Sequence, residues 1–82
     1  MTDTAHYLRD VLPELLGRAR EARARYEQQR GQDGESAAQF EAGRALAWYE
    51  VVSYLVQQID AFGIAHESVG LPEDLDVERE LL

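Results

Sequence analysis

The sequence predicts an all-α protein, an antiparallel helical hairpin with helices over about residues 4–30 and 37–62 that dimerises into a four-helix bundle and carries an acidic C-terminal tail. Two long stretches repeat apolar residues at helical spacing, and a glycine-containing segment separates them. Hydrophobic residues form 45% of the 82-residue chain, too many for a disordered polymer, and the chain has no cysteine. Since disulfides are excluded, we expect a partner chain to complete this small core.

The first predicted helix has apolar residues at alternating spacings of four and three, the pattern of a helix packed along one side. Pro13 lacks a backbone donor, so it either bends this helix or marks its first turn, with Asp10 as the N-cap. We expect one helix with a bend near residue 10. Its apolar positions are Leu8, Leu12, Leu15, Ala19, Ala22 and Tyr26.

A break between the helices is predicted at residues 31–35, where two glycines favour a turn. Ser36, followed three residues later by Gln39, has the form of a capping box, so the second helix is expected to begin there. Because the connection is short and the two helices have similar lengths, we expect them to be antiparallel neighbours.

Most of the circumference of the second predicted helix is apolar. Gly63, followed by the apolar Ile64, has the sequence of a Schellman C-cap and predicts the end of this helix. Because a helix that is apolar on several sides must be covered on more than one of them, we predict that two hairpins pack through their second helices. The polar residues of its central turns are confined mainly to one stripe, which comprises Glu50, Ser53, Gln57 and Asp60.

The predicted dimer interface combines aliphatic residues with aromatic residues whose polar groups suit an interface rim. Three further residues near the aromatic centre are candidates for contacts with a ligand or a partner. The predicted interface residues are Ala45, Trp48, Tyr49, Val52, Leu55, Val56 and Ile59. The candidate ligand or partner contacts are Arg44, Glu50 and Tyr54.

We divide the chain into a helical hairpin domain at residues 1–65 and an acidic C-terminal tail at residues 66–82. The tail holds six acidic residues against one arginine, and its leucines and valines are available for docking. It is expected either to fold back over the bundle or to stay flexible.

The charge distribution disfavours nucleic acid as a partner. The net charge is −8, although residues 17–30 hold five arginines against two glutamates, a local excess of +3. Those arginines are expected to pair with acids of the second helix rather than with a polyanion. Neither His6 nor His66 has a glutamate three residues before it, the spacing used in di-metal bundles, so we expect no metal or cofactor.

We found no catalytic motif, so the expected function is that of a non-enzymatic interaction protein, an adaptor or regulator that acts as a homodimer and binds a protein partner. One alternative is a bundle that binds a small ligand or a metal, with a pocket around Trp48, Tyr49, Arg44 and Glu50. A weaker alternative is nucleic-acid binding through residues 18–30. Without a long apolar run or a leader-like N-terminus, the chain is expected to be cytoplasmic and to have no membrane partner.

Overall fold

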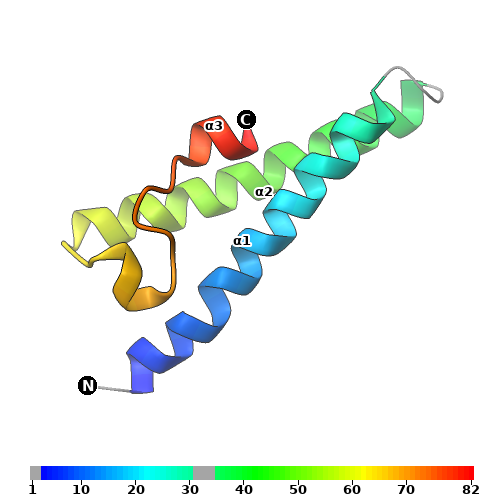
Figure 1. Ribbon diagram of the computed structural model, residues 1–82. Coiled ribbons are helices and arrows are strands. Elements are labelled where there is room, and N and C mark those ends of the chain that lie inside the picture. Colours follow the sequence, from blue (N-terminus) through cyan, green and yellow to red (C-terminus); the bar gives the residue numbers. More distant parts are fainter. Residues whose placement is uncertain (1–2, 31–34) are drawn as a thin grey trace.

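The computed structural model describes residues 3–30 and 35–82, and over these residues it is all-helical. Two long helices pack against each other as a hairpin, which confirms the predicted all-α hairpin (Figure 1). The elements are α1 (Asp3–Gln29), α2 (Glu35–Ala61), the 3₁₀ turn η1 (His66–Val69) and α3 (Val77–Leu81).

Helix α1 runs without interruption through Pro13, so the alternative in which this proline begins the helix is wrong. The predicted apolar residues lie on the side of α1 that faces α2 and the tail. Leu12, Ala19 and Ala22 of the predicted positions are buried, and the other three are half-buried, whereas Leu16, which is not among the predicted positions, is also buried.

Helix α2 begins at Glu35, so Ser36 lies inside the helix rather than at its N-cap. The break is predicted at residues 31–35, of which residues 31–34 lie outside the described residues and Glu35 belongs to α2. The predicted Schellman motif is confirmed, because Gly63 has a φ of 69° and its N–H donates to the carbonyl of Asp60 at 3.0 Å. The N–H of Ile64 donates to the carbonyl of Ile59, also at 3.0 Å, which completes the motif.

The hairpin is splayed, and the tail fills the opening. Figure 1 shows α1 and α2 close together near the connection and farther apart at the opposite end, where η1 lies against α1. Val69 and Leu71 are buried in one hydrophobic core with Leu12, Leu16 and Ile59. The residues after Gly63 therefore share the core of the two long helices.

Gly70 connects η1 to the extended segment that follows, and it lies directly against α1. Its φ of 81° is in the left-handed region, which favours glycine. A Cβ at this position would lie 2.9 Å from Cγ of Pro13 and 3.1 Å from the carbonyl oxygen of Arg9. Both the backbone conformation and the close approach to α1 therefore require glycine here.

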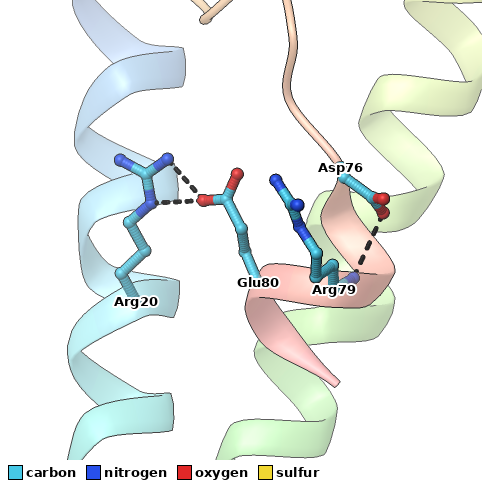
Figure 2. Close-up of polar contacts among 4 residues, drawn as sticks. All are labelled: Arg20, Asp76, Arg79 and Glu80. Carbon is cyan, nitrogen blue, oxygen red and sulfur yellow. Dashed lines mark hydrogen bonds and ion pairs between the residues drawn. The ribbon is translucent and has the colours of Figure 1, made fainter.

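The last part of the tail returns along the hairpin and ends in α3. The carboxylate of Asp76 caps this short helix by accepting a hydrogen bond from the N–H of Arg79 at 3.1 Å. Figure 2 shows Arg20 reaching across from α1 to Glu80, and its Nε donates to Oε1 of Glu80 at 2.9 Å. The ion pair is partly exposed to solvent, whereas Leu81 beside it is buried.

The molecule is elongated, with extents of 50 × 19 × 16 Å. Its radius of gyration is 14.5 Å, compared with about 12 Å for a compact domain of this length. An elongated shape leaves more of each long helix exposed than a compact one would.

We expect Gly70→Ala to destabilise the fold more than Gly63→Ala. Both glycines have positive φ, which costs a residue with a Cβ about 1–2 kcal/mol, but a Cβ at Gly63 would meet open space. The close contact with Pro13 should add about 1 kcal/mol or more to the cost at Gly70. Urea denaturation followed by circular dichroism measures the difference, and equal costs would show that η1 does not pack on α1 in this way.

We also expect apolar burial, rather than the ion pair in Figure 2, to hold the tail in place. Leu71→Ala should lower the free energy of unfolding by about 2–4 kcal/mol, because it removes a buried side chain from the opening between the helices. Arg20→Ala should cost less than about 1 kcal/mol, because the pair is partly exposed. A cost for Arg20→Ala that equals that of Leu71→Ala in the same denaturation assay would contradict this ranking.

Candidate protein interaction surface

The side of α2 that faces α1 is buried within the chain. Ala45, Val52 and Ile59 recur every seven residues, which keeps them on one side of the helix, and all three are buried. Val52 and Ile59 belong to the core that also contains Leu12 and Leu16 of α1. Helix α1 is thus the first of two elements that pack on α2.

The C-terminal tail is the second element that packs on α2. Tyr49 and Val56 of α2 line a groove together with Leu75 and Val77 of the tail. Nε2 of His66 lies 2.7 Å from Oδ1 of Asp60, which joins η1 to the end of α2. Part of the stripe predicted to be polar and solvent-facing therefore borders the tail: Ser53, Gln57 and Asp60 all line this groove.

A third side of α2 carries large apolar side chains, with Arg44 and Gln58 between them, and over the described residues most of these apolar side chains are exposed. We call it the open face and define it as Phe40, Ala47, Trp48, Val51, Tyr54 and Phe62. The exposed fractions are 67% for Phe40, 49% for Val51, 61% for Tyr54 and 76% for Phe62. Such a patch of large apolar side chains is typical of an interaction surface.

The open face includes a shallow groove next to α1. Its volume is about 270 Å³, and Leu15 of α1 forms one wall while Ala47, Trp48 and Val51 of α2 form the other. Arg44 closes one end, and its Nη1 lies 3.6 Å from Oε1 of Glu41. The lining is otherwise apolar, so the groove suits an apolar side chain better than a polar ligand.

The predicted interface residues occupy three different places. Ala45, Val52, Val56 and Ile59 are buried inside a single chain, where α1 and the tail cover them. Tyr49 and Leu55 are half-buried against the same core. Trp48 is also half-buried against this core, and it lines the groove at the edge of the open face.

Five of the six open-face residues are not among the predicted interface residues: Tyr54 is a candidate contact, and Phe40, Ala47, Val51 and Phe62 are in neither set. Phe40, Val51 and Phe62 share one side of the helix because each phenylalanine is eleven residues from Val51, or about three turns. This spacing is visible in the sequence. It does not separate the open side from the covered ones, because the positions of α1 and the tail decide which apolar side stays exposed.

The four residues of the alternative ligand pocket do not converge. Arg44 and Trp48 line the groove beside α1, whereas Tyr49 lines the groove beside the tail. Glu50 is exposed, and Tyr54 is exposed on the open face. In the part of the chain that the structure describes, no group of three or more His, Asp or Glu side chains is placed to hold a metal ion.

The arginine-rich part of α1 is largely paired, but not with α2 as the sequence analysis expects. Arg18 pairs with Glu14 at 3.1 Å, and Arg23 pairs with Glu27 at 2.7 Å, both within α1. Arg30 also pairs with Glu27, and its guanidinium lies 5.6 Å from the centroid of the Tyr26 ring. Arg20 pairs with Glu80 of the tail, as Figure 2 shows.

Comparison of the chain with known protein families, with curated proteins and with solved structures finds no match. Over residues 3–30 and 35–82, no helix is long and apolar enough to cross a membrane. What the chain can do must therefore be argued from its own surface.

We expect the chain not to bind double-stranded DNA even at low salt. Three arginines of α1, and Arg30 directly after it, are paired with carboxylates, and the net charge of −8 repels a polyanion. Fluorescence anisotropy of a labelled duplex, titrated at about 20 mM salt, where charge attraction is weakly screened, measures this. Binding that weakens with added salt and is lost in Arg18→Ala or Arg25→Ala would contradict the expectation.

Proposed function

We propose that the protein is a non-enzymatic helical interaction protein, an adaptor or regulator, that acts as a homodimer through the open face of α2. The observation that carries the proposal is the exposure of this face, four of whose six residues are at least 49% exposed. Water contact with Phe40, Val51, Tyr54 and Phe62 is unfavourable, and burial against a second chain removes it.

The surface area of the chain supports a partner of matching size. The accessible surface is 5683 Å², whereas a folded monomer of this mass exposes about 5,000 Å². The excess of about 700 Å² is close to the roughly 800 Å² that each partner buries in a standard interface. The chain therefore has enough surplus surface for a stable dimer.

The position of α1 supports a four-helix bundle as the form of the dimer. Val52 lies on the side of α2 that faces α1, and it is one residue, or about 100° around the helix, from Val51. Helix α1 therefore lies at about a right angle to the direction in which the open face points. A two-fold axis that joins two open faces and lies perpendicular to the two α2 helices then brings the two α1 helices to the same side. Four helices arranged in this way form a square bundle, and Leu15 faces its interior.

The state of association tests this proposal. Light scattering on the purified protein should give about twice the chain mass of 9.3 kDa. Val51→Arg should shift the protein to the single-chain mass, because it places a charge at the centre of the open face without disturbing a buried residue. Circular dichroism should show that the variant keeps its helices.

Gln57→Arg is the matched control. It adds the same charge to an exposed position of α2, but on the side of the tail, and it should leave the mass unchanged. A wild-type protein that stays a folded monomer at micromolar concentration, or a Val51→Arg variant that stays dimeric, would overturn the proposal. Val52 is a poor choice for the same test, because it is buried within the chain and its substitution by arginine should unfold either form.

A further inference from the structure

We infer that two copies of the chain pack their α2 helices in antiparallel orientation, with the two-fold axis passing beside Val51 of both copies. The inference rests on the proposed homodimer and specifies its geometry. It comes from a pattern in the open face that is nearly the same when counted from Val51 in either direction.

The pattern is a palindrome of residue type. Eleven residues from Val51 lie Phe40 on one side and Phe62 on the other, and three residues away lie Trp48 and Tyr54. All of these positions fall within about 60° of Val51 around the helix. Phe62 keeps this register because its N–H donates to the carbonyl of Gln58 at 3.0 Å, which continues the helical hydrogen bonds.

In an antiparallel pair, residues at equal distances on either side of Val51 lie at the same level. Phe40 therefore meets the partner's Phe62 at each end, about 16 Å from the centre. Near the centre, Trp48 lies at the level of the partner's Tyr54, and the small side chain of Ala47 leaves room for the partner's Leu55 at its own level. Each of these contacts occurs twice, once on either side of the two-fold axis, as in any isologous interface.

The same register keeps the two Arg44 side chains of the dimer apart. Nη1 of Arg44 lies 3.6 Å from Oε1 of Glu41, and both atoms are buried within the chain, whereas the Arg44 side chain as a whole is 34% exposed. Arg44 and Gln58 are each seven residues from Val51, so in the antiparallel pair the partner's Gln58, which is neutral, lies at the level of Arg44. A parallel pair would instead place the two Arg44 guanidinium groups opposite each other.

Acidic residues do not oppose this packing. Glu50 lies about 100° around α2 from Val51, and Asp60 lies on the opposite side of the helix, where it contacts His66. The tail covers that opposite side, so a second copy can occupy the open face while η1 and α3 remain docked.

Single cysteines test the geometry, since the chain has none of its own. Helix axes packed about 8–10 Å apart leave roughly 5 Å between the two Cα atoms at Val51, which suits a disulfide. Val51→Cys should therefore shift from single to double mass on a non-reducing gel after mild oxidation. Phe40→Cys alone should not shift, because its two copies lie about 33 Å apart, but a mixture of Phe40→Cys with Phe62→Cys should form the mixed disulfide.

Gln57→Cys, on the side of the tail, is the control and should stay at single mass. Light scattering on each variant under reducing conditions separates the two proposals. If the variants are dimeric but Phe40→Cys links to itself, the pair is parallel; if Val51→Cys does not link, the register is wrong. Either result overturns the inference and leaves the homodimer standing, whereas single mass for all variants and the wild type overturns both.

Discussion

The packing of the tail into the opening between α1 and α2 is the contact on which the rest of the structure depends. The two long helices meet near their connection and diverge, so a hairpin alone would leave Leu12, Leu16 and Ile59 in water at the open end. Val69 and Leu71 cover them, and Gly70 allows η1 to approach the ring of Pro13 closely enough for that cover to form. A chain this short cannot leave such area uncovered and remain folded.

The long helices could be predicted because each carries a periodic apolar pattern, and the end of α2 because Gly63 and Ile64 form a local motif. The start of α2 could not, since Ser36 matches a cap in sequence while the helix begins before it. The docking of the tail could not be predicted either. Its apolar residues, from Val69 to Leu81, follow no single period, and their positions are set by contacts with distant parts of the chain.

The candidate interaction surface, like the fold, could be predicted from the sequence only in part. That α2 needs more than one cover is visible in its composition, and the structure supplies α1 and the tail as two of them. Which side remains exposed depends on where both α1 and the tail lie: the expected interface residues Val52 and Ile59 face α1 and are interior, whereas Val51, one residue before Val52, is exposed. A step of one residue is about 100° around a helix, enough to change from core to surface.

The same arrangement bears on how a chain with a net charge of −8 can pair with itself. Residues 66–82 carry six acids, and they cover the side of α2 that lies opposite the open face. In the antiparallel dimer the two acidic segments therefore point outward, separated by the thickness of the bundle. That separation exceeds the Debye length of about 8 Å at physiological salt, so their repulsion is largely screened. The side through which the chains would meet carries apolar groups with Arg44 and Gln58, so closing the proposed interface brings no carboxylates together at its centre.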